Sequence, residues 1–294
     1  MIANPVAGRG AAAGLIQQAR ARFAEIGIRD LLITKRAGDE EILVNGAIAR
    51  GVRSFIVLGG DGTCSRVANA ILVSGVECIV AVMPTGTGND FAKTLGVQRA
   101  SLEDIATLVA TGPPCPIDVG FADGRYFLNS CGFGFDASVL EASNHVRLLK
   151  GDAVYIYSAL RQLFSYRGID VSATGAPGVK RSRMLMVTVS NGRFLGGAFK
   201  VAPYASVLDG KLDACFFGDS NVVERVKLFV GAMRGTHLGM RSVSAASVQH
   251  LSLTFKSNPL MEIDGELRRA TSSTVELTCV PRALSVIAAP GALA

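Results

Sequence analysis

Short apolar runs separated by helix-like stretches fill the first third of the chain. Continuous runs of β-branched and aliphatic residues predict strands over 31–34, 54–58 and 78–83. Amphipathic spacing predicts helices over 12–26 and 40–50, with Asp39 as the expected cap of the second. Strands without polar alternation are typical of parallel sheets covered on both faces. The pattern therefore predicts a doubly wound α/β domain.

The pattern changes after a proline-rich segment at 111–116, which cannot continue a helix. Beyond it strands dominate, and they are predicted over 117–121, 125–128, 184–189, 211–217, 248–255 and 274–280. Helices are expected over 137–166 and 221–233. We therefore predict an α/β domain over 1–115 and a β-rich domain over 116–294, whose last strand could return to the first domain.

Composition narrows the class of protein. Hydrophobic residues make up 49% of the 294 residues, which supports a packed core and excludes wholesale disorder. The net charge of +6 is too small and dispersed for a nucleic-acid binder, but it suits contact with phosphates or an anionic membrane surface. No apolar run approaches the roughly 20 residues of a membrane-spanning helix. The start lacks the pattern of a signal peptide and the six cysteines form no CxxC pair, so a reduced, cytoplasmic protein is expected.

Glycine and small polar residues gather where the predicted strands of the first domain end, which is where such sheets bind ligands. The first of these loops, 4–10, partly fits a dinucleotide-binding fingerprint. The next strand ends in Thr34-Lys35-Arg36 and offers no acidic residue for a ribose, so NAD is disfavoured as a cofactor. No Walker motif occurs, which excludes a P-loop NTPase.

Two further loops carry the strongest signal, Gly59-Gly60-Asp61-Gly62-Thr63 and Pro84-Thr85-Gly86-Thr87-Gly88-Asn89-Asp90-Phe91. Glycines let backbone amides approach phosphate oxygens, and a helix that starts after such a loop adds a favourable dipole. Asp61 is then a candidate for Mg²⁺ or for orienting a phosphate-bound metal. Thr87 and Asn89 are candidates for contact with phosphate or ribose. The alternative for both loops is a tight turn whose polar residues only cap the next helix.

These two loops and five other motifs resemble the diacylglycerol kinase catalytic-domain family, in particular its bacterial lipid kinases. Besides the two loops above, the motifs are Asn4-Pro5-x-x-Gly8, Gly132-Phe133-Gly134-Phe135-Asp136, Asn191-Gly192, Leu208-Asp209-Gly210-x-Leu212-Asp213 and Asp264-Gly265-Glu266. The resemblance covers nearly the whole chain. It implies a nucleotide domain like those of NAD kinases and 6-phosphofructokinases, followed by a β-sandwich. It also implies transfer of the γ-phosphate of ATP to a lipid hydroxyl.

Site residues follow from the resemblance by position. It implies an ATP site lined by Asn4, Thr34, Gly60, Asp61, Gly62, Thr63 and Thr87, to which the residue chemistry adds Asn89. It implies a structural Mg²⁺ held by Asp209 and by the backbone carbonyls of Ser206 and Lys211. It places the general base within Asp264-Gly265-Glu266, with Asp264 and Glu266 both open. For each of these Asp-Gly pairs the alternative is a plain hairpin turn.

Two departures from the family pattern affect the nucleotide loops. Cys64-Ser65-Arg66 stands where many bacterial members have an apolar residue followed by Asn-Glu, and Ala7 replaces a common serine. Both put nucleotide affinity in question more than the reaction class. Separately, the stretch 147–167 mixes basic, aliphatic and aromatic side chains, as a helix on an anionic bilayer does. The alternative is that its aromatic residues, Tyr155, Tyr157, Phe164 and Tyr166, pack on the sandwich.

We therefore expect an ATP- and Mg²⁺-dependent kinase of diacylglycerol or a related lipid, bound peripherally to the inner face of the membrane. A homodimer is compatible with the exposed sheet edges of a β-rich domain. Two alternatives stay open. A kinase for a soluble acceptor such as NAD would act without vesicles, and a non-catalytic nucleotide-responsive regulator would bind ATP without turnover.

Overall fold

A computed structural model describes residues 1–143, 166–176 and 182–293. The chain divides into two compact units, unit 1 (Met1–Val119 and Pro281–Ala294) and unit 2 (Gly120–Val280). The division falls inside strand β5 (Cys115–Ala122), because the proline-rich segment ends helix α5 (Leu102–Thr111) and leads directly into that strand. The chain therefore passes from one unit to the other within continuous strands.

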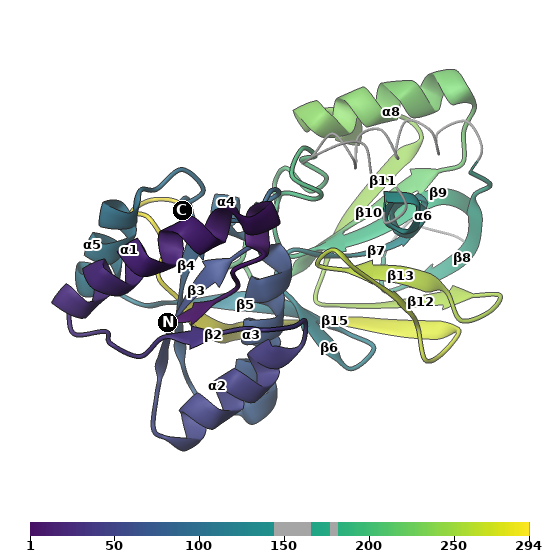
Figure 1. Cartoon of the computed structure of the whole chain (residues 1–294). Helices are drawn as coiled ribbons and strands as arrows, with labels where there is room; N and C mark the ends of the chain where they lie inside the picture. Colours follow the sequence, from purple (N-terminus) through teal and green to yellow (C-terminus); the bar gives the residue numbers. More distant parts are fainter. Residues whose placement is uncertain (144–165, 177–181, 294) are drawn as a thin grey trace. The chain divides into compact units, whose positions relative to one another are not determined.

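Unit 1 contains a parallel sheet flanked by helices. Its strands are β1 (Ile2–Ala3), β2 (Leu32–Ile33), β3 (Ser54–Gly59), β4 (Ile79–Pro84) and the end of β15 (Thr274–Val286), paired in the order β2-β1-β3-β4-β15. Helix α2 (Asp39–Ala49) packs on α3 (Asp61–Ser74), and α1 (Ala11–Glu25) packs on α5. The helices cover both faces of the sheet (Figure 1), which confirms the doubly wound prediction.

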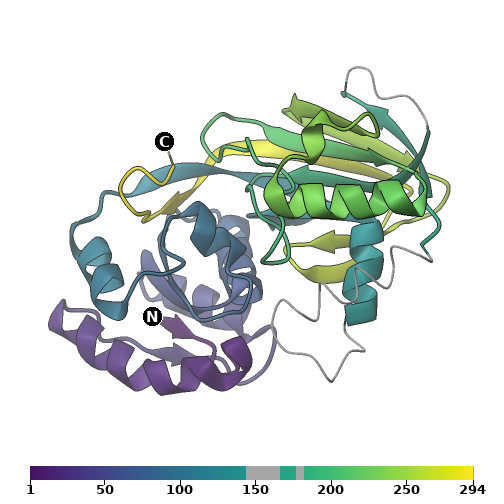
Figure 2. The ribbon, with the colours of Figure 1, turned by 90° about the horizontal axis from the view of Figure 1, so that it is seen from above.

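Unit 2 is a β-sandwich-like domain built from antiparallel strands. These are β6 (Arg125–Phe127), β7 (Ser130–Gly134), β8 (Ile169–Thr174), β9 (Ser182–Ser190), β10 (Leu212–Gly218), β11 (Val243–Val248), β12 (His250–Phe255), β13 (Leu260–Ile263), β14 (Glu266–Arg269) and the first part of β15. The α-helices among its described residues are α6 (Phe135–Ser143) and α8 (Val222–Arg234). Both ribbon views show α8 lying along the outside of the strands (Figures 1 and 2).

The alternation of strand β10 explains how unit 2 is layered. Leu212, Ala214 and Phe216 point into the core of the sandwich, together with Phe133 of β7. Cys215 and Phe217 point the other way, into a second apolar cluster that α6 and α8 cover. A period of two residues therefore gives this strand two buried faces.

Several expected elements differ from the structure. The strand expected over 248–255 is β12, which begins two residues later because Val248 still pairs with Leu212 of β10 as the last residue of β11; β11 itself was not expected. Asp39 is not the cap of α2, which begins one residue earlier after Gly38; the Asp39 carboxylate instead accepts hydrogen bonds from the amides of Lys35 and Arg36. Of the helix expected over 137–166, the structure describes α6, and 144–165 lie outside the described residues. The membrane-surface prediction for 147–167 lies almost wholly outside them as well. Within the described ranges, no helix has the length and apolarity to cross a bilayer.

Candidate nucleotide site and carboxylate hairpin

The glycine-rich loops of unit 1 meet at the carboxyl edge of its parallel sheet. Asn4 follows β1, Gly60–Thr63 follow β3 and begin α3, and Thr85–Asn89 lead from β4 into α4 (Asp90–Thr94). The Asn4 amide donates to the Leu58 carbonyl, and the Thr85 amide donates to the Gly59 carbonyl. Each loop is thus fastened to the neighbouring strand at the point where it leaves the sheet.

Backbone packs directly against backbone between the second and third loops. A Cβ atom on Gly86 would lie 2.5 Å from the Gly60 Cα, and a Cβ on Gly60 would lie 3.0 Å from the Gly86 Cα. A Cβ on Gly59 would lie 2.6 Å from the Thr63 Cβ. Glycine is therefore required at these positions by close approach rather than by an unusual φ angle.

The polar side chains of the loops are tied to one another. Asp61 Oδ1 accepts a hydrogen bond from the Phe91 amide at 3.1 Å, so this carboxylate joins the start of α3 to the start of α4. Asn4 Nδ2 donates to Thr63 Oγ1 at 3.0 Å, and Asn4 Oδ1 accepts from the Val6 amide. Asp61 therefore has a cross-loop role that the sequence did not indicate.

The remaining predicted nucleotide residues occupy different environments. Thr34 is buried at the end of β2, where its amide donates to the Ala3 carbonyl at 3.0 Å. Asn89 has a left-handed φ of 52° and folds the loop back, since its Nδ2 donates to the Gly86 carbonyl at 2.9 Å. Thr87 lies exposed at the tip of the third loop. The structure thus brings Asn4, Gly60, Asp61, Gly62, Thr63, Thr87 and Asn89 to one edge of the sheet, with Thr34 buried at the end of β2.

In unit 2 the Asp264-Gly265 pair forms the two-residue turn between β13 and β14. Both residues have positive φ, 47° and 84°, as a tight hairpin turn requires. The turn is also anchored from a distance. The Asp264 carboxylate is buried and accepts hydrogen bonds from the amides of Leu128, Asn129 and Ser130 at 2.8, 2.8 and 3.2 Å. Because three donors stabilise its charged form, this carboxylate is poorly suited to take up a proton.

A second carboxyl pair lies behind the hairpin, and the sequence reasoning missed it. Glu262 of β13 is buried and accepts a hydrogen bond from the Gly265 amide, and it lies beside Asp136, which is in the first turn of α6. Burial raises the pKa of Glu262 well above its usual value, and the charge of Asp136 raises it further. Gly132, opposite Glu262 in the sheet, makes room for both groups, since a Cβ there would lie 1.9 Å from Asp136 Oδ2.

Glu266 differs from these buried carboxylates. It is the first residue of β14, its side chain is 29% exposed, and one oxygen lies 3.7 Å from the Arg125 guanidinium. Of the two acids that flank Gly265, Glu266 is therefore the more accessible one.

Comparisons with known proteins cover both units. A family model described as "Diacylglycerol kinase catalytic domain" matches residues 1–122, and one described as "YegS C-terminal NAD kinase beta sandwich-like domain" matches residues 129–288. A relative from Pseudomonas putida, named "Probable lipid kinase YegS-like", is 31% identical over 79% of each chain. The chain belongs to the diacylglycerol kinase family.

Two further comparisons concern a second relative and the fold. A Bacillus subtilis protein named "Diacylglycerol kinase" is 26% identical to the kinase over 90% of this chain and 88% of its own. A crystal structure of a diacylglycerol kinase from Bacillus anthracis superposes with a TM-score of 0.73 at 22% identity, covering 100% of this chain and 97% of that one. This second likeness confirms the predicted fold class.

The first departure of the kinase from its family pattern has a structural explanation. Cys64 and Ser65 are buried in α3, and the Arg66 guanidinium lies 3.6 Å from the carboxylate of Glu40, a fully buried residue of α2. Glu40 also accepts a hydrogen bond from the Gly38 amide. Cys64-Ser65-Arg66 therefore serves the packing of α2 on α3, where Arg66 balances a buried charge.

The predicted metal turn of the kinase is a compact loop before β10. The Lys211 amide donates to Asp209 Oδ1 at 3.0 Å, the Leu208 amide donates to Ser206 Oγ, and Gly210 has a φ of 72°. Burial, together with the nearby Asp209 carboxylate, raises the pKa of Asp213 to about 6. Within the described ranges, no three acidic, histidine or cysteine side chains converge as a metal cluster, so a cation here would depend on backbone carbonyls.

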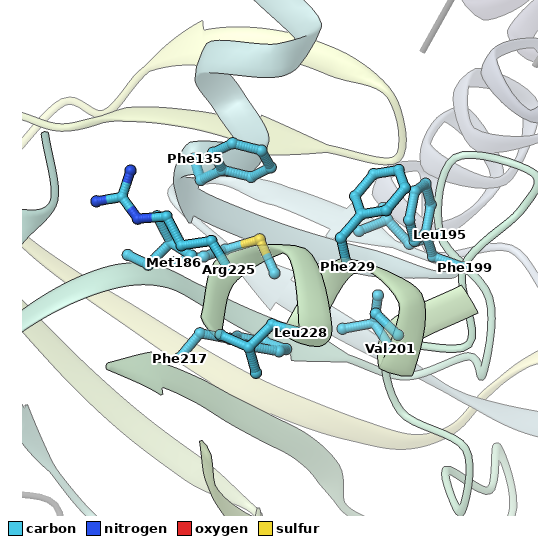
Figure 3. Close-up of a pocket in the computed structure, with 11 residues that line it drawn as sticks. Phe135, Met186, Leu195, Phe199, Val201, Phe217, Arg225, Leu228 and Phe229 are labelled. Carbon is cyan, nitrogen blue, oxygen red and sulfur yellow. The ribbon is translucent and has the colours of Figure 1, made fainter. Parts of the chain in front are cut away.

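An apolar pocket in unit 2 of the kinase lies between α6, α8 and strands β9 and β10 (Figure 3). It encloses about 60 Å³. Its walls are formed mainly by the apolar side chains of Phe135, Leu185, Phe199, Phe217, Leu228 and Phe229. Arg225 also lines it, but its guanidinium is bound by the Asp219 carboxylate and by the carbonyls of Ser220 and Tyr166. The pocket therefore suits a hydrocarbon group and offers no charge to a headgroup.

Proposed function

We propose that this kinase transfers the γ-phosphate of ATP to the hydroxyl of diacylglycerol or a closely related lipid at the inner face of the cytoplasmic membrane. Membership of the diacylglycerol kinase family and the names of the relatives, "Diacylglycerol kinase" and "Probable lipid kinase YegS-like", support phosphate transfer to a lipid. The observation that carries the lipid acceptor is the apolar pocket of unit 2, which would hold part of an acyl chain. The pocket volume of about 60 Å³ compares with about 10–15 Å³ for a cavity that holds one water molecule, so the pocket has room for a short stretch of hydrocarbon.

ATP would bind at the strand-end loops of unit 1. The amides at the start of α3, from Gly60 to Thr63, have no acceptor within the helix and would donate to phosphate oxygens. The exposed Thr87 hydroxyl would donate from the facing loop. Asn4, Asp61 and Asn89 would keep the loops in place through the hydrogen bonds described above.

Glu266 would act as the general base, and Asp264 would position the hairpin that carries it. In the transfer, the lipid oxygen forms a bond to the γ-phosphorus while the bond from that phosphorus to the bridging oxygen of ADP breaks. The hydroxyl proton passes to the Glu266 carboxylate. Asp264 is a poor candidate for this step because its carboxylate already accepts three amide donors.

Mg²⁺ fits the turn before β10. Asp209 and the backbone carbonyls of Ser206 and Lys211 would hold it, and its charge would relieve the repulsion that Asp209 exerts on Asp213. A further Mg²⁺ that arrives bound to ATP would neutralise phosphate charge.

The test is incubation of the purified kinase with radiolabelled ATP and a panel of lipids in mixed micelles, with products identified by mass spectrometry. We expect phosphatidic acid from diacylglycerol, and loss of this product in Asp61→Ala protein that retains its fold. Phosphorylation of NAD without any lipid would favour the soluble-acceptor alternative. ATP binding with no product on any acceptor would favour the regulator.

A further inference from the structure

The outward face of helix α8 is apolar, which is unusual for a helix on the outside of a domain. Five of its exposed residues are aliphatic, Val222, Val223, Val226, Val230 and Met233. Their spacing places them on one stripe along the helix. The buried residues Arg225, Leu228, Gly231 and Ala232 occupy the opposite side. Helix α8 therefore has two apolar faces, and the described residues of its domain that pack against it do so on the inner face.

The charges around this stripe are of one sign. Lys227 and Arg234 are exposed beside it, whereas the acidic residue of the helix, Glu224, is partly buried on the other side. Tyr204 lies close to the end of α8, since a Cβ on Gly235 would be 3.3 Å from the neighbouring Pro203, and Tyr204 is 82% exposed. Aliphatic residues flanked by cations, with a tyrosine near one end, are typical of a helix that lies in the surface of an anionic bilayer.

The covered face of α8 connects this stripe with the pocket. Leu228, Phe229 and Ala232 line the apolar pocket from one side of the helix (Figure 3). Phe229 is only partly buried and lies three residues from Val226 and four from Met233. One turn of helix thus separates the outward stripe from the wall of a space that suits an acyl chain.

We propose that the outward face of α8, comprising Val222, Val223, Val226, Val230 and Met233 with Lys227 and Arg234, docks the kinase on an anionic lipid bilayer. The proposal rests on the proposed function and adds the surface that meets the membrane. An acyl chain could then move from the bilayer along α8 without crossing water. A protein partner fits less well, because the centre of a protein–protein interface is enriched in aromatic anchors, whereas the centre of this surface consists of four valines and one methionine.

The chain contains no tryptophan, so a single introduced tryptophan reports its own surroundings. Val223 on α8 and Val73 on α3 are matched sites, 66% and 70% exposed. With vesicles of phosphatidylcholine and phosphatidylglycerol, we expect the emission of Val223→Trp to shift to the blue and that of Val73→Trp to stay unchanged. No shift at Val223, or an equal shift at both sites, would overturn the proposal.

Vesicle co-sedimentation tests the same surface through substitutions that should weaken membrane binding. We expect Val226→Asp/Val230→Asp to weaken binding to anionic vesicles at least tenfold, and the control Ile42→Asp/Val73→Asp to bind as the unaltered kinase does. A second variant, Lys227→Glu/Arg234→Glu, keeps every aliphatic residue and changes only exposed charges, so it tests the same surface even if the first variant misfolds. It should weaken binding to anionic vesicles tenfold and leave binding to pure phosphatidylcholine unchanged. Equal binding by all variants would refute the proposal.

Two outcomes separate this proposal from the proposed function. If the unaltered kinase phosphorylates a soluble short-chain diacylglycerol but does not bind vesicles, the docking surface is wrong and the function stands. If analytical ultracentrifugation shows a dimer that Val226→Asp/Val230→Asp converts to a monomer, the stripe is an interface between two copies, and the membrane proposal fails. If vesicles bind through α8 but no lipid is phosphorylated, the function fails alone.

Discussion

The strand-end loops of unit 1 and the hairpin of unit 2 are held in place by different parts of the chain. In unit 1, backbone packs on backbone at Gly60 and Gly86, and the hydrogen bonds that link the loops join residues 30 apart (Asp61 and Phe91) and 59 apart (Asn4 and Thr63). In unit 2, Asp264 is held by amides more than 130 residues earlier, and the charge of Asp136 acts on the buried Glu262, which follows it by more than 120 residues. A site built from close backbone contacts requires glycines, which can be recognised in the sequence. A site built from buried carboxylates uses aspartate and glutamate, which look the same in the sequence as exposed acidic residues.

The largest expected effect concerns the accessible acid of the hairpin. Glu266→Gln removes the proposed proton acceptor, so kcat for lipid phosphorylation should fall by about 10²–10⁴, with little change in the KM for ATP. Glu276→Gln, an exposed glutamate of β15, serves as the control and should keep full activity. A Glu266→Gln protein with more than a tenth of the original kcat would show that the base lies elsewhere.

Asp264→Asn tests whether the neighbouring acid is structural. The amide side chain presents one acceptor oxygen and an NH₂ group to three amide donors, so the free energy of unfolding should fall by roughly 2–3 kcal/mol. Urea unfolding followed by circular dichroism measures this change. Asp170→Asn breaks an exposed ion pair with Lys256 and should cost less than about 1 kcal/mol. Equal costs for the two variants would remove the anchoring role of Asp264.

Gly86→Ala tests the backbone contact of unit 1. A methyl group 2.5 Å from the Gly60 Cα must push the second and third loops apart, and we expect the Kd for ATP to rise at least tenfold in isothermal titration calorimetry. Gly14→Ala is the matched control, because Gly14 lies at the end of the first turn of α1 and a Cβ there meets nothing within 4 Å. It should leave ATP binding unchanged and stabilise the fold by about 0.5–1 kcal/mol. Unaltered ATP affinity in Gly86→Ala would contradict this account of the loops.

The smallest expected effect is a change in how the stability of the protein depends on pH, and it comes from the titration of Glu262. Its pKa is raised in the folded state, so between the unfolded and the folded pKa the folded protein keeps a proton that the unfolded chain releases. This group therefore makes stability fall as pH rises above its ordinary value of 4.5. Glu262→Gln cannot titrate, so its Tm should decline less than that of the unaltered kinase between pH 5 and pH 8. Parallel Tm curves would show that Glu262 does not titrate in the folded protein as inferred.

The sequence predicted most reliably the parts of the fold that local patterns specify. Strands β3 and β4 and helix α8 lie within one residue of their expected bounds. Strand β11 was missed, because between Val243 and Val248 it consists of serine and alanine, which have little preference for strands. Its pairing with β10 identifies it, and that pairing is a tertiary contact that the local sequence does not record.

The same limit applies to the site. Glycine spacing marked the loops of unit 1, and the contact between Gly60 and Gly86 shows why those glycines are needed. Nothing in the local sequence distinguishes Glu262 from an exposed strand glutamate, since its burial depends on the space left by Gly132 on another strand. A glycine opposite an acidic residue would have indicated a buried carboxylate, but recognising it requires the pairing register of β7 and β13, which the sequence does not give.

The position of β15 has a consequence for how the protein is made. Its last residues, Ser285 and Val286, pair with Ile79 and Val80 of β4, and the Ala289 amide donates to the Leu95 carbonyl. A ribosome therefore releases the final strand of the nucleotide-binding sheet only after all of unit 2 has been synthesised. Until then β4 is an open edge in the nascent chain, a template for wrong pairing that cellular chaperones would have to shield.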